Sequence, residues 1–171
     1  SAKNNATECL HLTKDISHTN STAHLFCLQI AGGIELVQGN LEEAEKYYKK
    51  TMESNLSKYS KNQNYVGHLA LGIIYANRKN YRLAEEQIKE SVKILEETFL
   101  SDFPLYSEII GNLAWVLLMQ DKVEESYSLA EKAAENYIKH VDKIFKYTSE
   151  KDKIRTLQAA DIDFYASVAM K

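Results

Sequence analysis

The sequence predicts an all-α fold built from antiparallel helix hairpins. The main observation is a pattern of small and large residues that recurs along the chain at the spacing of a helical hairpin. The composition agrees with it, because one proline and six glycines among 171 residues are too few for a loop-rich or all-β protein. In addition, no alternating apolar run bounded by turn residues competes with the helical pattern. At this length we expect one domain with a continuous core.

The clearest copy of the pattern lies in residues 65–91. Gly72 and Ala84 are small, so they would let two antiparallel helices approach each other closely. Tyr75 and Ile88 are large and would fill the space around that contact. This order of small and large residues predicts one helical hairpin.

The same pattern recurs before and after this hairpin, as an array requires, because a single repeat cannot bury its apolar face alone. Ala44, Ala84 and Ser126 occupy equivalent places, 40 and 42 residues apart. Two positions depart from the pattern. Ser126 stands where alanine is expected, and Glu35 stands where an aromatic residue is usual.

This pattern resembles the tetratricopeptide repeat. Its long period is similar to the long-helix variety found in kinesin light chains and many bacterial regulatory proteins. The resemblance implies a right-handed superhelical array of about seven or eight helices, whose first helices line a concave groove. It also implies that the groove binds a protein or peptide segment, as in a scaffold or regulatory domain.

Each element can be placed along the chain. We expect helical repeats over 1–147, consisting of a closing helix at 4–18 and repeats at about 21–60, 63–100 and 104–147. A C-terminal helix at 148–171 would follow, as a possible junction to a further domain. The paired helices of the three repeats are expected at 21–38 and 41–56, at 65–78 and 81–99, and at 104–120 and 122–145.

Turn and cap residues support these boundaries. Gly39 should turn the chain, and Asn40 should cap the next helix. Asn80 should cap the second helix of the central hairpin. Asp121 has a glutamate three residues later, the spacing of a capping box, and is expected to cap the last long helix. Pro104 suits the first turn of a helix, where its missing N–H has no partner to lose.

The expected groove residues are the positions between the core residues on each first helix. Most are apolar, which favours a helix, or another part of the same protein, as the bound segment. The alternative for each is a place in the core of a tightly coiled array. The expected residues are Phe26, Gln29, Gly33, Val37, Val66, Leu69, Ile73, Asn77, Glu108, Trp115 and Met119.

The residues at 145–168 carry a second resemblance, to the segment that joins such repeats to the peptidase domain of CHAT proteins, a caspase-like family. The residues at the matching places are Tyr147, Ser149, Glu150, Lys153, Leu157, Phe164 and Ser167. The resemblance implies the regulatory repeat region of a larger bacterial CHAT-type protein, with any peptidase beyond Lys171. The alternative is a free-standing adaptor or peptide-sensing domain with no attached enzyme.

Within these residues we expect no enzyme, no cofactor and no metal site. Cys27 and His24 could touch on one helix, but no sheet is encoded that would hold a nucleophile and its base. His11, His18 and His24 are spaced by seven and six residues, whereas metal ligands on helices usually follow at three or four. We therefore expect these histidines to be solvated or to cap helices, and not to bind a metal.

Charge and hydropathy exclude further classes of partner. The formal net charge is −3 with basic and acidic residues interleaved, which disfavours nucleic acid. No apolar run reaches the roughly 18 to 20 residues that a membrane span needs. Cys9 and Cys27 are too few for a disulfide framework, so we expect two reduced core thiols and a cytoplasmic protein.

Overall fold

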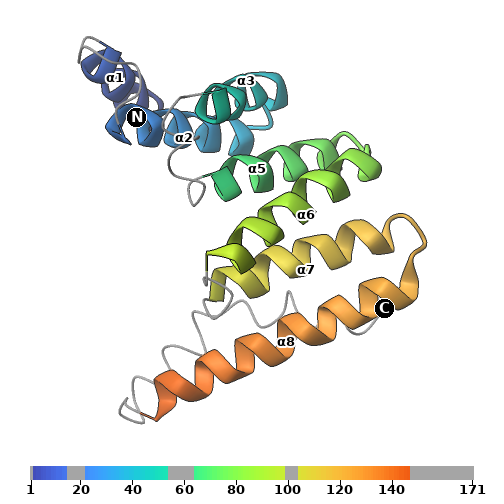
Figure 1. The fold of residues 1–171 in the computed structure, drawn as a ribbon. Coiled ribbons are helices and arrows are strands. Elements are labelled where there is room, and N and C mark those ends of the chain that lie inside the picture. Colours follow the sequence, from blue (N-terminus) through green and yellow to red (C-terminus); the bar gives the residue numbers. More distant parts are fainter. Residues whose placement is uncertain (1, 15–21, 54–63, 99–103, 147–171) are drawn as a thin grey trace. The chain divides into compact units, whose positions relative to one another are not determined.

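The computed structural model describes residues 2–14, 22–53, 64–98 and 104–146, and within them it has seven helices and no strand (Figure 1). The all-α prediction is confirmed. Contacts divide the chain into two units, Ser1–Ile94 and Leu95–Lys171, which are described separately. The helices are α1 (Ala2–Lys14), α2 (Thr22–Val37), α3 (Leu41–Glu53), α5 (Asn64–Asn77), α6 (Tyr81–Glu97), α7 (Pro104–Leu118) and α8 (Val123–Phe145).

The three hairpins share one backbone turn. In each, a single residue has a positive φ, namely Gly39 at 79°, Lys79 at 58° and Asp121 at 60°. The N–H of the residue that follows donates to a carbonyl five residues earlier, at N···O distances of 2.9, 2.9 and 3.1 Å. This is the usual left-handed end of an α-helix. Its recurrence after 40 and 42 residues reproduces on the backbone the period seen in the side chains.

The start of the last helix differs from the prediction. Asp121 was expected to cap it but takes the left-handed turn position instead. Lys122 therefore holds the cap position, and its carbonyl accepts a hydrogen bond from Ser126 N at 3.0 Å. Asn80 caps α6 as predicted, because its Oδ1 accepts from Leu83 N at 3.4 Å.

Small residues allow the paired helices of the first unit to approach closely. A Cβ added at Gly72 of α5 would collide with the Ile88 side chain of α6 and lie 3.3 Å from the Ala84 carbonyl oxygen. In the preceding hairpin, a Cβ at Gly32 would lie 2.9 Å from the Tyr48 ring. The predicted contact between a small residue and a large one is thus found in both hairpins.

A shared apolar cluster joins α3 of one hairpin to α5 of the next. Gly67 contributes to this approach, since a Cβ there would lie 2.8 Å from Met52 Cγ. Burial of such apolar surface is the main force that holds stacked repeats together. The buried members are Ala44, Tyr48, Ala70, Leu71 and Ile74, flanked by Leu36, Leu41, Met52, Val66 and Tyr75.

In the second unit, α7 packs against α8 and two buried hydroxyl groups find partners between them. Ser126, which replaces the expected alanine, donates from Oγ to the Ala114 carbonyl at 2.7 Å. Ser107 donates from Oγ to Asn136 Oδ1 at 2.7 Å. A buried hydroxyl is tolerated when it is hydrogen-bonded, which explains why serine can stand in the alanine position.

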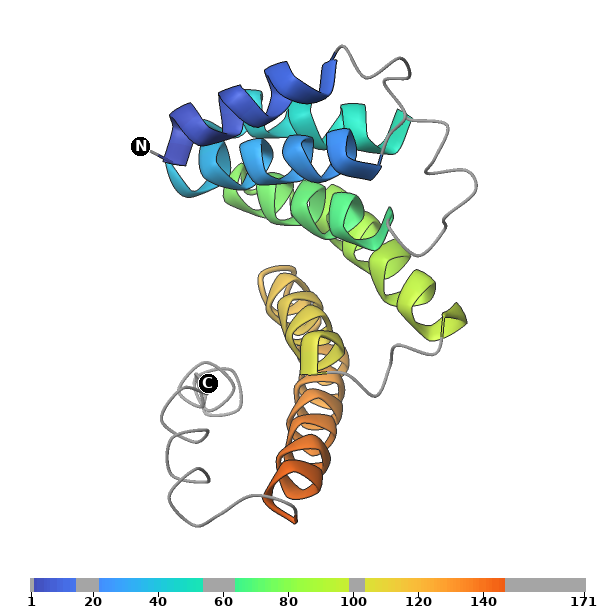
Figure 2. The same cartoon turned by 90° about the vertical axis from the view of Figure 1, so that its left-hand side faces the viewer.

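The first helix is attached covalently, which corrects the prediction of two reduced thiols. α1 lies along α2 (Figure 2), and Cys9 forms a disulfide with Cys27 across a Cα–Cα distance of 5.7 Å. Thr13 Oγ1 and His24 Nδ1 form a hydrogen bond of 3.0 Å along the same helix pair. Two cysteines that are 18 residues apart meet because α1 folds back on α2, an arrangement that their spacing alone does not reveal.

The contact at Gly72 predicts a large asymmetry between two glycines. Gly72→Ala should lower the free energy of unfolding by about 1 to 3 kcal/mol, because the added methyl group overpacks the contact with Ile88. Gly33→Ala is the control, since its Cβ would meet only the Tyr48 hydroxyl at 3.5 Å and should gain about 0.5 to 1 kcal/mol from helix propensity. Urea denaturation followed by circular dichroism measures both. Equal effects would contradict the assigned contact.

The disulfide predicts a redox-dependent stability. Reduction should lower the free energy of unfolding by about 3 kcal/mol, the value typical of a loop of this length. The measurement is urea denaturation with and without a phosphine reductant. The Cys9→Ser/Cys27→Ser variant should match the reduced chain and be indifferent to reductant. Two free thiols in the native, unreduced chain would show that the bond does not form.

Candidate functional site

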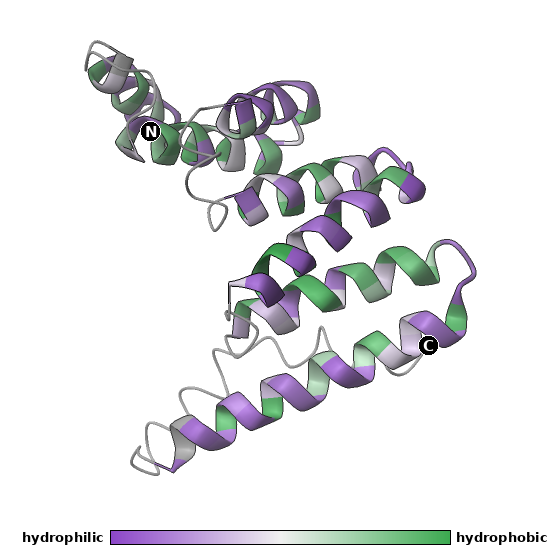
Figure 3. Cartoon of the chain, viewed as in Figure 1, coloured by the Kyte–Doolittle hydropathy of each residue, from purple (hydrophilic) through white to green (hydrophobic). Residues whose placement is uncertain are grey.

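The first helices of the hairpins differ in character from the second helices. α2, α5 and α7 are apolar over most of their surface, whereas α3 and α6 are largely polar (Figure 3). A helix that is apolar on most sides normally buries most of them. Large apolar side chains that stay exposed on such a helix therefore mark a candidate binding surface.

One line of apolar side chains on α2 is open to solvent. Phe26 is 63% exposed, Ile30 is 41% exposed and Val37 is 90% exposed. Together with Gly33, which is half-buried, they follow the spacing of one helix face. We call these four residues the α2 stripe. The sequence prediction missed Ile30, although its position four residues after Phe26 could have identified it.

The corresponding line on α5 is more enclosed. Val66, Leu69 and Ile73 are half-buried, and Asn77 is exposed with its side-chain amide donating to the Ile73 carbonyl at 2.9 Å. We call these the α5 stripe. Because α2 and α5 contact each other, and because Ile73 occupies the place that Gly33 has one repeat earlier, the two stripes together form the α2–α5 surface.

The remaining expected residues fall into two groups. Gln29 lies on α2 and is half-buried. Glu108, Trp115 and Met119 lie on α7 or directly after it in the second unit, where Glu108 and Met119 are exposed and Trp115 is half-buried. All the expected groove residues are exposed or half-buried, although Val66 also packs against the apolar cluster of α3 and α5, and a binding role for them stays a prediction.

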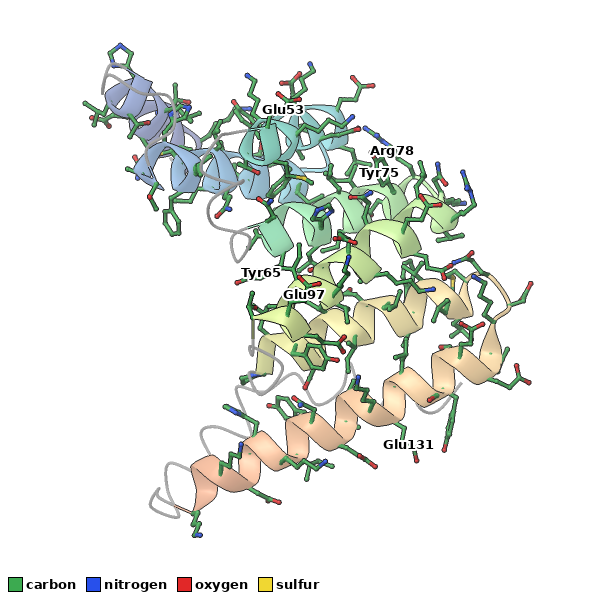
Figure 4. The ribbon with its side chains drawn as sticks, viewed as in Figure 1. Glu53, Tyr65, Tyr75, Arg78, Glu97 and Glu131 are labelled. Carbon is green, nitrogen blue, oxygen red and sulfur yellow. A yellow bond between two sulfur atoms is a disulfide. The ribbon has the colours of Figure 1, made fainter. Side chains whose placement is uncertain are left out.

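A charged cluster fixes α5, and with it the α5 stripe, against α3. Glu45 of α3 pairs with Lys49 at 2.7 Å and with Arg78, directly after α5, at 2.5 Å, and it accepts a hydrogen bond from the Tyr75 hydroxyl at 3.3 Å. Figure 4 labels two of these partners, Tyr75 and Arg78. Burial opposes ionisation of this carboxyl. The hydrogen bonds and charges of Lys49 and Arg78 outweigh the burial, so the pKa of Glu45 lies below its ordinary value.

Glu35 is the equivalent of Tyr75 one repeat earlier, and it likewise links its helix to the preceding one. This contact accounts for its departure from the repeat pattern. Its carboxylate is buried, pairs with Lys3 of α1 at 2.8 Å and accepts from Asn40 Nδ2 at 2.7 Å. The hydrogen bonds from Lys3 and then Asn40 lower the pKa of Glu35. Glu35 thus contacts the preceding helix α1, just as Tyr75 in the equivalent place contacts Glu45 of α3.

A third polar cluster lies in the second unit. The Tyr106 hydroxyl donates to the Glu96 carboxylate, and Lys132 Nζ donates to the Tyr106 oxygen at 2.8 Å and lies 5.3 Å from the ring centroid. Burial and then the bond to Glu96 raise the pKa of Tyr106. These groups satisfy one another and hold the start of α7 beside α8, a structural role.

The residues weighed earlier for catalysis or metal binding have other partners. Cys27 is bonded to Cys9, so its sulfur is no free nucleophile, and His24 contacts Thr13. His18 lies outside the described residues. Among the residues that the structure describes, no group of three or more His, Cys, Asp or Glu side chains could hold a metal ion.

Within the described ranges, no helix combines the length and the apolar character that crossing a bilayer requires.

Comparison with known proteins shows the fold. No protein-family model matches the sequence, and no curated protein matches it. Among solved structures, a Podosopora anserina putative kinesin light chain with nearly identical TPR-like repeats has a TM-score of 0.66 at 13% identity, covering 97% of this chain and 84% of that chain. A second crystal structure, of a substituted form of that protein, gives a TM-score of 0.66 at 11% identity, with coverage of 92% and 84%.

These neighbours confirm the prediction of a TPR-like helical repeat fold. At such low identity the likeness concerns the fold alone. It gives no support to the resemblance of residues 145–168 to the CHAT junction, nearly all of which lies outside the described residues.

The Glu45 cluster predicts a pH dependence. Because the pKa of Glu45 is lower in the folded chain, the cluster contributes stability at neutral pH and loses it as pH falls through the folded pKa, below the ordinary value of 4.5. The free energy of unfolding should therefore fall more steeply between about pH 5.5 and about pH 3 in the wild type than in Glu45→Gln. Urea denaturation at stepped pH measures this. Identical slopes would contradict the depressed pKa.

Proposed function

We propose that this chain is a non-enzymatic protein-interaction module whose α2–α5 surface binds an amphipathic helical segment of a protein. The observation that carries the proposal is the α2 stripe, where three large apolar side chains, Phe26, Ile30 and Val37, are exposed to solvent. Exposed apolar surfaces on helices commonly receive the apolar face of a partner helix. Trp115 and Met119, in the second unit, are proposed as a contact for a protein segment in their own right.

The fold supports binding of a polypeptide. Stacked helical hairpins expose rows of side chains along their first helices, which suits extended recognition of a polypeptide. The polar clusters around Glu45 and Tyr106 link helices to one another, so they have a structural use already. We propose no cofactor and no catalytic residue within these 171 residues.

The finer proposal concerns the source of the bound segment. In one version the segment belongs to the same full-length protein, a bacterial CHAT-type protein whose repeats position or restrain a caspase-like peptidase. Its support is the sequence at 145–168. In the alternative version the chain is a free-standing adaptor for another protein. The reading frame after Lys171 discriminates between them, because the first version requires an α/β domain with a paired cysteine and histidine there.

The cellular compartment is a further proposal. The cytoplasm stays a prediction from composition, and the Cys9–Cys27 disulfide weighs against it, because cytosolic thiols are normally kept reduced. Thiol blocking at the moment of cell lysis, followed by mass spectrometry, decides the question. A blocked, reduced pair would favour the cytoplasm, whereas an intact bond would favour an oxidising compartment.

The binding surface is tested with a display library of amphipathic helical peptides selected on the full chain. A selected peptide should bind about 30-fold more weakly to Phe26→Ser and to Val37→Ser, because each removes an apolar anchor worth about 2 kcal/mol. Lys50→Ser, an exposed change on α3, is the control and should bind as the wild type does. Fluorescence anisotropy measures the affinities.

Two outcomes would contradict the proposed surface. The first is a library that yields no binder to the well-folded chain. The second is a set of binders whose affinity is the same for wild type, Phe26→Ser and Val37→Ser, which would place the binding site elsewhere.

A further inference from the structure

The helix α1 buries little of its own surface against the rest of the first unit. Among its described side chains, Ala6 and Thr13 are buried, Cys9 and Leu10 are half-buried, and the others are exposed, including Leu12 at 65%. A helix that buries so few apolar atoms gains little from the hydrophobic effect when it docks. The apolar part of the contact with α2 therefore holds α1 only weakly.

The contact is also incompletely packed. A cavity of about 30 Å³ lies between α1 and the helices that it covers. Its lining includes Ala6 and Leu10 of α1, Ala31 and Ile34 of α2, and Tyr47 of α3. Side chains around a cavity lack neighbours on one side, so they attract one another less than the side chains of a close-packed interface do.

Polar contacts join α1 to α2 on both sides of the disulfide, and they add little. Lys3 Nζ lies 2.8 Å from Glu35 Oε1, but the lysine side chain is 57% exposed, and ion pairs that are open to water contribute little. Thr13 Oγ1 lies 3.0 Å from His24 Nδ1. If α1 left α2, Glu35 would keep the hydrogen bond from Asn40, so its charge would not lose every partner.

The sequence of α1 does not favour a helix that persists without this docking. The helix has 13 residues, and isolated helices shorter than roughly 12 to 15 residues are marginal in water. Asparagine and threonine, which favour helices less than alanine does, occur at Asn4, Asn5, Thr7 and Thr13. Once detached, α1 should therefore lose its helical structure.

We propose that the Cys9–Cys27 disulfide is a switch that keeps α1 folded on α2 and releases it on reduction. The bond lies between the two polar contacts along the helix pair. Cys27 is 2% exposed and Cys9 is half-buried, so Cys9 is the more accessible of the two to a thiol. The hairpin contacts at Gly32 and Gly72 do not involve α1, so they remain after its release.

The chemical step is thiol–disulfide exchange with a dithiol. A thiolate of the dithiol attacks the Cys9 sulfur, the S–S bond breaks, and Cys27 leaves as a thiolate that takes up a proton. The second thiol of the dithiol then attacks the mixed disulfide and frees Cys9. Two thiols form on the protein while the dithiol becomes a disulfide, so two electrons are transferred. An oxidised dithiol reverses these steps and restores the bond.

Release of α1 would open a further apolar part of α2. Ala31 and Ile34 line the cavity below α1. Ile34 follows Ile30 of the α2 stripe by four residues, which places the two side by side on the helix. The exposed stripe would thereby widen. The release of α1 does not depend on the proposed function, whereas any effect on binding at the α2 stripe rests on it.

Hydrogen exchange of the full chain, oxidised and reduced with dithiothreitol, tests the switch. In the oxidised chain we expect protected amides in α1. After reduction these amides should exchange within about tenfold of the rate of an unstructured peptide, while amides at 70–74 in α5 stay far slower. Cys9→Ser/Cys27→Ser should behave as the reduced chain does, and oxidised dithiothreitol should restore protection in the wild type.

Lys3→Ser is the matched control for the polar contacts. In the oxidised variant α1 should stay protected, because the disulfide remains. Release of α1 by Lys3→Ser alone would assign the control to the ion pair and overturn the proposal. Protection of α1 that survives reduction, or its absence in the oxidised chain, would also overturn it. Loss of protection at 70–74 to the level of an unstructured peptide would do so too, because the whole unit would then unfold.

A second measurement follows a side chain that α1 covers. Hydroxyl-radical footprinting of the oxidised wild type and of Cys9→Ser/Cys27→Ser needs no reductant. Tyr47, which lines the cavity below α1, should be modified several-fold faster in the variant. Tyr106, which is 2% exposed and lies in the second unit, is the control and should react equally in both proteins. An unchanged rate at Tyr47 would show that α1 stays docked without the bond.

Discussion

The close approach of paired helices at small residues is the constraint on which the rest of this structure depends. Gly72 leaves no room for a Cβ against Ile88, and Gly32 leaves little against Tyr48. Helices in contact at such points can cross in only a few ways, because the side chains around the contact must interlock. The rotation of α2 and of α5 about their axes is thereby fixed, and so is the set of side chains that each leaves exposed.

Because this rotation is fixed, the candidate site and the polar clusters lie on different sides of the same first helices. The face of α2 opposite the hairpin contact carries Phe26 and Val37 to solvent. Another side of the first helix reaches the preceding helix, where Glu35 and Tyr75 find polar partners on α1 and α3. Hydrogen bonding and charge pairing there add specificity to the stacking, while burial of apolar surface supplies most of its stability.

The sequence predicted the features that depend on local spacing. Helix positions and the Gly72 contact follow from the helical period, whereas the sequence left open whether Phe26 and Val37 are exposed or lie in the core. The disulfide did not follow from the period, because the meeting of Cys9 with Cys27 depends on how α1 packs on α2. The turn at Asp121 was missed for a similar reason: aspartate suits both a cap and a left-handed residue, and the position of the hairpin decides between them.

Residue-resolved hydrogen exchange of the native chain tests the central constraint most directly. We expect the amides around the Gly72 contact, at 70–74 in α5 and 84–88 in α6, to exchange most slowly in the first unit, because they open only when the unit unfolds globally. Amides of α1 should exchange faster once the disulfide is reduced. Exchange at 70–74 as fast as in reduced α1 would contradict this constraint, since the hairpin contact would then not be the stable centre of the array.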